Sequence, residues 1–285
     1  MFETLITAEE ARQGIGRAGW RFVDCRFQIR DPGAGRQAYE EGHIPGAVYA
    51  HLDDDLSGPI IPGVTGRHPL PDEDSVTALI RRLGIRAGMQ VVVYDDLGGR
   101  IAARLWWTLR YAGLDAVAVL DGGWPAWLEA GMEQSRDGVT VSPSDFNPTF
   151  QREQVVSTEM LVAWMAEQKL PLLLDARAPE RYRGEVEPLD PVAGHIAGAR
   201  SVPCADSLTA EGRFRDRASL REALKPLVST GADVDDVAIA YCGSGVTACH
   251  LILAMSHAGL ERPRLYPGSW SEWCLDSQRP ISKSP

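Results

Sequence analysis

The stretch VAIAYCGSGVTACHLILAM, residues 237–255, decides how this chain is best interpreted. A short apolar run ends at Cys242, a glycine-containing loop follows, and an apolar segment long enough for a helix comes next. A continuous short apolar run is typical of a strand that is buried on both faces of a parallel sheet. The pattern therefore predicts a strand, a tight turn and a helix that begins near Thr247.

The same order of features occurs earlier in the chain, in VVVYDDLGGRIAARLWWTL at residues 91–109. Three other pairs of segments repeat with it: RFVDCRF with LLLDARA, EEGHIPGAVYA with VAGHIAGARSV, and AVLDGGWPAWLEAG with RLYPGSWSEWCLDS. The offset stays between 146 residues, from Trp124 to Trp270, and 152 residues, from His43 to His195. Four matches in one order indicate a tandem duplication of one long unit.

A linker between the two copies is predicted at residues 136–152, where Ser, Asp, Asn and Pro are frequent and no helical apolar stripe is sustained. This gives an N-terminal domain over residues 1–135 and a C-terminal domain over residues 153–285. Each domain alternates short apolar runs with helical patterns, which predicts an α/β fold in which helices flank a parallel sheet.

Particular elements can be placed within this fold. MQVVVYD (89–95) and DVAIAYC (236–242) are predicted to be buried strands. SVTALIRRLG predicts a helix with Ser75 as its N-cap and Gly84 at its end. SLREALKPL has a similar apolar stripe, but Pro226 is expected to kink or stop that helix.

The bulk composition excludes several classes of function. A net charge of −10 disfavours a nucleic-acid partner, because phosphate binding requires a basic surface. No apolar run approaches the roughly 20 residues that a membrane span needs, so we expect no membrane partner. The N-terminus has no apolar region of the secretory kind, and the five scattered cysteines form no CxxC pair. We therefore expect a cytoplasmic protein without a disulfide framework.

Cys242 is either a small buried thiol or a nucleophile. Gly243, Ser244 and Gly245 allow a tight turn that directs main-chain N–H groups inward, and the following helix adds the positive end of its dipole. Such surroundings stabilise a thiolate or a bound anion. The duplication places Asp95 opposite Cys242, so the N-terminal domain lacks this thiol and is expected to be catalytically silent. Cys249, inside the apolar helix, is expected to be inert.

Together these motifs resemble the tandem-domain rhodanese family of sulfurtransferases, over nearly the whole chain. The resemblance is carried by GHIPGA and GHIAGA, the DxR pairs, the endings DGGWPAW and GSWSEW, and the loop from Cys242 to Thr247. It implies two rhodanese-like domains and a persulfide on Cys242. The loop CGSGVT resembles that of 3-mercaptopyruvate sulfurtransferases. Thiosulfate-preferring members usually carry two cationic side chains where this chain has Gly243 and Ser244, and added positive charge suits a dianion.

The resemblance also implies a set of site residues. A proton relay would use Ser244, His68 of TGRHPLP, and an aspartate of HLDDDLSG, for which Asp54 is selected with Asp53 and Asp55 as alternatives. Arg181 matches a substrate-binding arginine, with Arg183 as the alternative. The donor would also contact the loop residues Gly243, Gly245, Val246 and Thr247.

A second substrate arginine that 3-mercaptopyruvate sulfurtransferases usually carry is absent. The matching place holds Leu189 or Asp190, and Arg200 is a possible replacement.

The implied activity is transfer of sulfane sulfur from 3-mercaptopyruvate, through the Cys242 persulfide, to cyanide or a thiol, with ping-pong kinetics and no metal or organic cofactor. The donor and acceptor are small molecules, and no particular protein acceptor is indicated. Thiosulfate as the donor, and a non-enzymatic persulfide carrier, are the alternatives.

Other interpretations of the motifs are weaker. A cysteine-dependent phosphatase or arsenate reductase would need an arginine at the sixth place after Cys242, where Ala248 stands. His43 and His195 are expected to hold turns rather than a metal, because they occur in both domains. The paired tryptophans Trp124, Trp127, Trp270 and Trp273 are expected to pack in the core.

Overall fold

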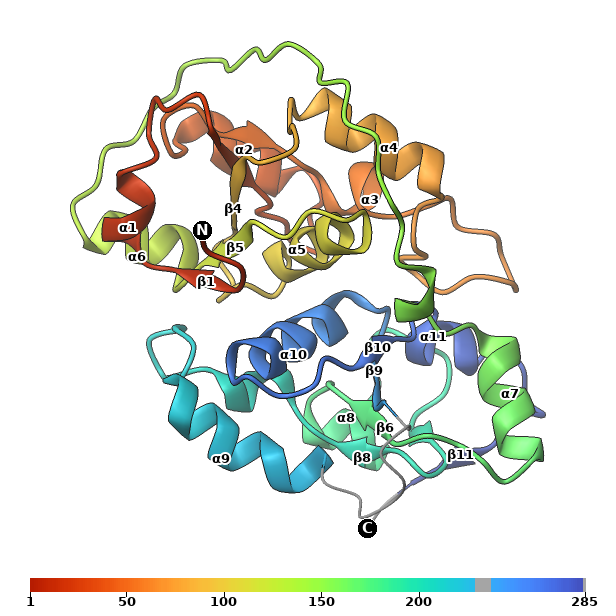
Figure 1. The fold of residues 1–285 in the computed structure, drawn as a ribbon. Coiled ribbons are helices and arrows are strands. Elements are labelled where there is room, and N and C mark those ends of the chain that lie inside the picture. Colours follow the sequence, from red (N-terminus) through yellow and green to blue (C-terminus); the bar gives the residue numbers. More distant parts are fainter. Residues whose placement is uncertain (229–236, 284–285) are drawn as a thin grey trace. The chain divides into compact units, whose positions relative to one another are not determined.

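The structure, a computed structural model, describes residues 1–228 and 237–283. The chain divides into two compact units (Figure 1). The first contains Met1–Gly58, Pro71–Gln151 and Ala210–Phe214, and the second contains Pro59–Leu70, Arg152–Thr209 and Arg215–Pro285. Each unit therefore takes one short segment from the half of the sequence that mainly forms the other unit.

The first unit contains a parallel sheet with strand order β1-β5-β4-β2-β3. Its strands are β1 (Leu5–Ile6), β2 (Trp20–Asp24), β3 (Val48–Tyr49), β4 (Gln90–Tyr94) and β5 (Val117–Leu120). Its helices are α1 (Ala8–Arg12), α2 (Ala34–Glu41), α3 (Leu52–Asp55), α4 (Glu73–Arg82), α5 (Ala102–Tyr111) and α6 (Gly123–Glu129). Strand β4 is buried along its whole length, as its apolar run predicts.

Helix α4 forms where its apolar stripe predicts, but its cap differs. The N-cap is Asp72, whose carboxylate accepts a hydrogen bond of 2.7 Å from the Ser75 main-chain N–H. The prediction of Ser75 as the cap was wrong, because the aspartate three residues earlier already satisfies that N–H. The helix ends before Gly84, whose φ of +65° is the left-handed conformation that glycine adopts readily.

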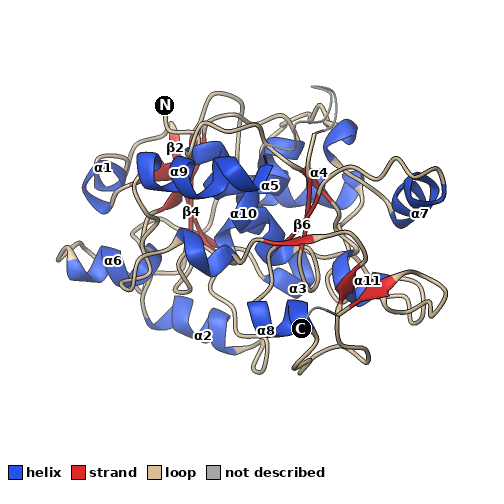
Figure 2. Cartoon of the chain, turned by 90° about the horizontal axis from the view of Figure 1, so that it is seen from below, coloured by secondary structure: helices blue, strands red, loops and turns tan. Residues whose placement is uncertain are grey.

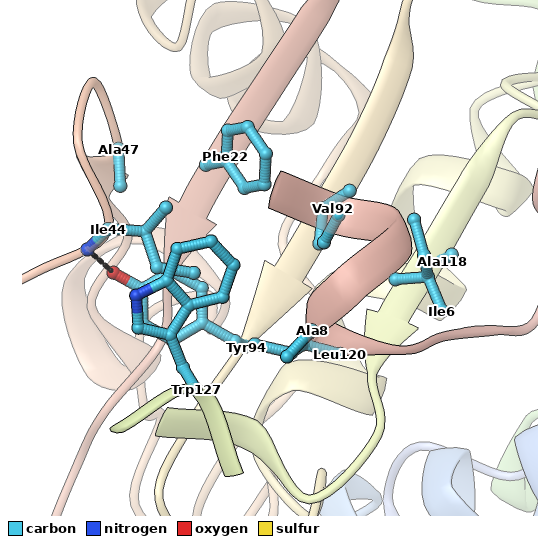
Figure 3. Packing of buried hydrophobic residues seen from close by; sticks show 11 residues of the cluster. Ile6, Ala8, Phe22, Ile44, Ala47, Val92, Tyr94, Ala118, Leu120 and Trp127 are labelled. Atoms are coloured by element: carbon cyan, nitrogen blue, oxygen red, sulfur yellow. Dashed lines mark hydrogen bonds between the residues drawn. The ribbon is translucent and has the colours of Figure 1, made fainter. Parts of the chain in front are cut away.

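The core of the first unit lies between the sheet and its helices (Figure 3). Phe22, Val92 and Ala118 from adjacent strands pack with Trp127 of α6. Tyr94 is fully buried, and its hydroxyl accepts a hydrogen bond of 3.1 Å from the main-chain N–H of Ile44. This bond ties the carboxyl end of β4 to the GHI turn.

The second unit contains a parallel sheet with strand order β10-β9-β6-β8 and a separate antiparallel pair, β7 with β11. Its strands are β6 (Leu173–Asp175), β7 (His195–Ile196), β8 (Arg200–Ser201), β9 (Ile239–Tyr241), β10 (Arg264–Leu265) and β11 (Ile281–Ser282). Its helical elements are η1 (Arg152–Gln154), α7 (Thr158–Ala166), α8 (Pro179–Arg183), η2 (Cys204–Ser207), α9 (Arg217–Val228), α10 (Val246–His257) and α11 (Ser269–Trp273). Figure 2 separates strands from helices by colour. Helices flanking a parallel sheet in each unit confirm the predicted fold class.

The proline of the second apolar stripe does not end its helix. Pro226 lies inside α9, which continues to Val228, so it does not stop the helix at its own position. It lies in the last turn, where its missing N–H removes a single helical bond.

The predicted linker is extended, and through Gln151 it packs on the first unit. The Ser144 N–H donates to the Arg81 carbonyl at 2.9 Å. The Gln151 N–H donates to the Tyr111 carbonyl, also at 2.9 Å.

The strand predicted at 236–242 is observed only at Ile239–Tyr241, and Asp236 lies outside the described residues. None of the helices described in residues 1–228 and 237–283 has the length and apolarity required to cross a bilayer.

Candidate active site

A buried ion pair supports the carboxyl end of the sheet in each unit. In the second unit, Arg177 Nη2 lies 2.6 Å from the Asp175 carboxylate and donates to the Gly194 carbonyl at 2.7 Å. The Arg177 guanidinium also lies 4.8 Å from the ring centre of Trp270. The carboxylate of Asp175 raises the pKa of Arg177 against the opposing effect of burial. The first unit repeats these contacts with Asp24, Arg26, Gly42 and Trp124.

The two GHI histidines contact the main chain, as their predicted structural role requires. His195 Nδ1 lies 2.7 Å from the Tyr182 carbonyl, and its ring stacks on that tyrosine at 3.8 Å. His43 makes the matching contact with the Tyr39 carbonyl at 2.8 Å. Within the part of the chain that the structure describes, no group of three or more His, Cys, Asp or Glu side chains is placed to hold a metal.

Cys242 follows the end of β9 and is only 2% exposed. Its N–H donates to Ser269 Oγ at 3.1 Å, and its carbonyl accepts from the Trp270 N–H at 3.0 Å. Gly245 has a φ of +79°, and a Cβ built there would lie 2.6 Å from the Pro267 carbonyl oxygen. Only glycine fits this turn. Helix α10 then begins at Val246, one residue before the predicted start.

Helix α10 begins close to Cys242 in sequence, and the role of its main-chain donors toward the thiol stays a prediction. The N–H groups of its first turn have no helical carbonyl to bind, and they carry the positive end of the dipole. They follow Cys242 after three intervening residues. Cys249, deeper in α10, is fully buried and its thiol donates to the Gly245 carbonyl at 3.3 Å, in line with its expected inert role.

The second unit brings Ser244 and His68 together. His68 Nδ1 lies 2.7 Å from Ser244 Oγ, and either atom can be the donor. Both residues are 7% exposed. His68 belongs to this unit because the segment Pro59–Leu70 packs on it, and the Arg67 main-chain N–H donates to Ser271 Oγ at 3.1 Å. The pairing of histidine and serine therefore occurs as the resemblance implied.

The aspartate of the expected relay belongs to the first unit. Asp54 is 75% exposed, and its carboxylate lies 3.3 Å from His51 Nδ1. Of its neighbours, Asp55 pairs with Arg82 at 2.6 Å, and partial burial raises the pKa of Asp53. The participation of Asp54, or of either neighbour, in a relay with His68 stays a prediction.

Two guanidinium groups face the residue after Cys242. A Cβ built on Gly243 would lie 2.9 Å from Arg67 Nη2 and 3.3 Å from Arg181 Nη1. The alternative arginine, Arg183, instead pairs with Glu185 at 2.7 Å near the surface. Arg200 is exposed and donates to the Leu227 carbonyl at 3.0 Å, so it does not replace the missing second arginine. Arg67 was missed in the sequence, although it directly precedes His68.

Carboxylates hold both guanidinium groups. Arg181 Nη2 lies 2.6 Å from Glu187 and 3.3 Å from Asp190, and Arg67 Nη1 pairs with Asp190. The side chains of Glu187 and Asp190 are each 3% exposed. Burial raises the pKa of Asp190, although Arg67 opposes the shift. Asp190, one of the two residues at the place of the missing arginine, is thus the ion-pair partner of Arg67.

The matching loop of the first unit contains its own anion. Asp95 is fully buried, and its carboxylate accepts four main-chain hydrogen bonds of 2.7–2.8 Å, from Leu97, Gly99, Ile101 and Ala102. The Asp95 carbonyl accepts from the Trp124 N–H at 2.7 Å, as the Cys242 carbonyl accepts from Trp270. The two loops therefore have the same position in their folds, but one contains a carboxylate and the other a thiol.

Comparison with known proteins agrees with the duplicated architecture. The profile of the rhodanese-like domain matches residues 7–130 and 157–276. This chain belongs to the rhodanese family. A relative of this rhodanese-family chain, the probable 3-mercaptopyruvate sulfurtransferase of Pseudomonas aeruginosa, is 45% identical over 98% of this chain and 97% of its own. The putative thiosulfate sulfurtransferase SseB of Mycobacterium tuberculosis is 42% identical over 99% and 97%.

Solved rhodanese structures are similar over nearly the whole chain. The 3-mercaptopyruvate sulfurtransferase from Leishmania major has a TM-score of 0.81 at 30% identity, covering 95% of this chain and 74% of that one. SseA from Escherichia coli, described as a 3-mercaptopyruvate sulfotransferase, has a TM-score of 0.79 at 30% identity, covering 95% and 100%. These matches confirm the prediction of two rhodanese-like domains.

Proposed function

We propose that this rhodanese-family chain is a sulfurtransferase that takes sulfane sulfur from 3-mercaptopyruvate onto Cys242 and passes it to cyanide or a thiol. The single observation that carries the choice of donor is the hydrogen bond of 2.7 Å between His68 and Ser244, two residues after the nucleophile. A buried hydroxyl–imidazole pair is suited to moving a proton next to a reacting thiol.

The first half-reaction forms the persulfide. The Cys242 thiolate attacks the sulfur of 3-mercaptopyruvate, a sulfur–sulfur bond forms, and the carbon–sulfur bond breaks. The electron pair of the broken bond goes to carbon and gives the enolate of pyruvate. The proton of the donor's thiol then passes through Ser244 and His68 to the enolate carbon, so pyruvate leaves and the persulfide stays on the enzyme. The N–H groups at the start of α10 stabilise the negative sulfur.

The second half-reaction restores the enzyme. Cyanide or a thiolate attacks the outer persulfide sulfur, the sulfur–sulfur bond breaks, and its electron pair returns to Cys242. Because each half-reaction has a covalent enzyme form, the kinetics are ping-pong. The relevant partners are a small-molecule donor and a small-molecule acceptor, and the chemistry uses no metal or organic cofactor. The cytoplasmic location expected from the cysteine pattern stays a prediction.

Thiosulfate is the second candidate donor. Two guanidinium groups beside Gly243 could bind a dianion, although the loop itself is neutral. However, Glu187 and Asp190 offset these positive charges, and this arrangement favours a donor with a single carboxylate.

The deciding experiment compares kcat/KM for 3-mercaptopyruvate and thiosulfate, with cyanide as acceptor. We expect a clear preference for 3-mercaptopyruvate, with equal amounts of pyruvate and thiocyanate formed. A preference for thiosulfate would overturn the donor assignment. Mass spectrometry after donor alone should find one added sulfur on Cys242. A chain that keeps that sulfur and releases none to cyanide would be a persulfide carrier rather than an enzyme.

A further inference from the structure

We propose that Ser271 positions His68 against Ser244 and so governs proton transfer in the first half-reaction. This inference rests on the proposed sulfurtransferase function and adds a positioning residue to it. The contact concerned joins the segment Pro59–Leu70 to the short helix α11, and both belong to the second unit.

Ser271 holds the loop of Cys242 and the segment of His68 at the same time. Its main-chain N–H donates to the Gly243 carbonyl at 2.8 Å, one residue after Cys242. Its hydroxyl accepts from the Arg67 main-chain N–H at 3.1 Å, one residue before His68. Ser271 is buried, so water competes little for these two bonds. One serine therefore joins the two segments that carry the proton relay.

The two segments approach each other closely at this contact. A Cβ built on Gly66 would lie 2.5 Å from Ser271 Oγ and 2.7 Å from the Gly268 carbonyl oxygen. Both distances are too short for real atoms, so the main chain at position 66 reaches the serine only because it is glycine. The Ser271 hydroxyl donates to the Gly268 carbonyl at 3.4 Å, which leaves its lone pairs available to the Arg67 N–H.

The alignment of the imidazole follows from the main chain beside it. His68 Nδ1 lies 2.7 Å from Ser244 Oγ, and in the proposed mechanism a proton crosses this distance. Losing the bond between Ser271 and the Arg67 N–H frees the main chain next to His68, so the imidazole is less often aligned for transfer. The Arg67 side chain stays paired with Asp190, so the segment keeps its place in the unit. The loss is therefore one of alignment and not of folding.

The test compares Ser271→Ala with Ser256→Ala, a matched control in α10 whose buried hydroxyl oxygen has no hydrogen-bond partner among the described residues. We expect Ser271→Ala to lower the single-turnover rate of pyruvate formation at saturating 3-mercaptopyruvate by about 10-fold, because proton transfer depends steeply on alignment. The donor concentration for half-saturation should change by less than about twofold. Ser256→Ala should match wild type. Gly66→Ala, which pushes the segment away from the same hydroxyl, should reproduce the loss.

Two further measurements separate positioning from a general structural role. Inorganic polysulfide transfers one sulfur to Cys242 and leaves as a shorter polysulfide, so no enolate needs a proton. Enzyme loaded in this way should pass its sulfur to cyanide equally fast in wild type and Ser271→Ala, whereas a distorted cysteine loop would slow this step too. In a His68→Gln background, Ser271→Ala should have little added effect, because no imidazole remains to be positioned.

An unchanged rate of pyruvate formation in Ser271→Ala would overturn the inference. So would an equal loss in the transfer to cyanide, or an undiminished loss in the His68→Gln background. If His68→Gln itself formed pyruvate as fast as wild type, the relay of the proposed function would fail instead, so the two failures are distinguishable.

Discussion

The loops after β4 and β9 occupy equivalent places in the two units, yet one contains a carboxylate and the other a thiol. Asp95 fills its loop and accepts four main-chain hydrogen bonds. The loop of Cys242 is shorter before its helix, which begins at Val246, whereas α5 begins only at Ala102. The main chain of Cys242 is tied to the following turn, because its N–H donates to Ser269 Oγ and its carbonyl accepts from the Trp270 N–H.

This difference separates what the fold requires of the loop, an acceptor for its main-chain N–H groups, from what sulfur transfer requires, a thiol. A ring of inward N–H groups needs an anion or another acceptor. In the first unit that acceptor is the Asp95 carboxylate, which takes four main-chain hydrogen bonds. In the second unit the equivalent position is Cys242, and under the proposed function its thiolate, its persulfide or the bound donor would be the acceptor. Catalytic silence of the first unit follows as a proposal from this occupied loop.

The largest expected effect comes from exchanging the thiol between the loops of Cys242 and Asp95. We expect Cys242→Ser to abolish sulfur transfer, because its hydroxyl cannot form a persulfide. Adding Asp95→Cys to Cys242→Ser should restore no measurable transfer, because Leu97 stands where Ser244 stands in the second unit. Thiocyanate formation from 3-mercaptopyruvate and cyanide measures both effects. Activity in the double variant would mean that the loop alone suffices.

Removing the internal anion should destabilise the first unit. Asp95→Ala leaves several buried N–H groups without their acceptor, and we expect the free energy of unfolding to fall by about 3 kcal/mol. Asp95→Asn, which keeps an oxygen acceptor but adds N–H donors, should lose less. Urea titration of each variant against wild type gives the values. Wild-type stability in Asp95→Ala would show that the carboxylate is not the element that holds this loop.

Two substitutions of Ser269, in the turn that supports Cys242, distinguish the effect of backbone strain from that of a lost hydrogen bond. Ser269 has a φ of +56°, and its hydroxyl accepts from the Cys242 N–H. Its counterpart is Gly123, at a φ of +59°. Ser269→Ala keeps the strained backbone and loses the bond, whereas Ser269→Gly also relieves the strain, so we expect Gly to be more stable than Ala by about 1 kcal/mol. Thermal unfolding tests the order, and the reverse order would contradict this account.

Asp96 occupies the place of Gly243 in the duplicated loop. Its substitution is expected to have the smallest effect on the free energy of unfolding, and that effect depends on pH. Burial raises the pKa of Asp96, and the charge of Asp95 adds to the shift. The fold therefore favours the neutral acid, and this contribution to stability is present at low pH and lost as pH rises through the raised pKa.

Asp96→Asn mimics the neutral form. It should be more stable than wild type at neutral pH by about 0.5 kcal/mol, since partial exposure screens the charge. The difference should disappear below the ordinary pKa of an aspartate, at about pH 4. Urea titrations across this range measure the gap, and a gap that widens in acid would reverse the sign of our argument.

The repeated motifs made most of the architecture predictable. Apolar runs of strand length and the helical stripe at Val76, Leu79 and Ile80 depend on local spacing, so they can be interpreted without tertiary information. The helix cap at Asp72 could not be assigned with the same certainty, because Asp72 and Ser75 both carry suitable oxygens and local geometry decides which one accepts. The antiparallel pair of β7 and β11 joins segments far apart in sequence and was not predicted.

For the site, the sequence by itself indicated Cys242 as the proposed nucleophile, since it lies between a buried strand and a glycine turn while Asp95 stands in its duplicate. It also indicated Ser244, His68 and Arg181 through the family resemblance. Only the tertiary structure placed Arg67 beside Gly243 and paired it with Asp190. These residues are 123 positions apart. Spacing along a chain reports faces of helices and strands, whereas ion pairs between distant segments depend on how those segments pack.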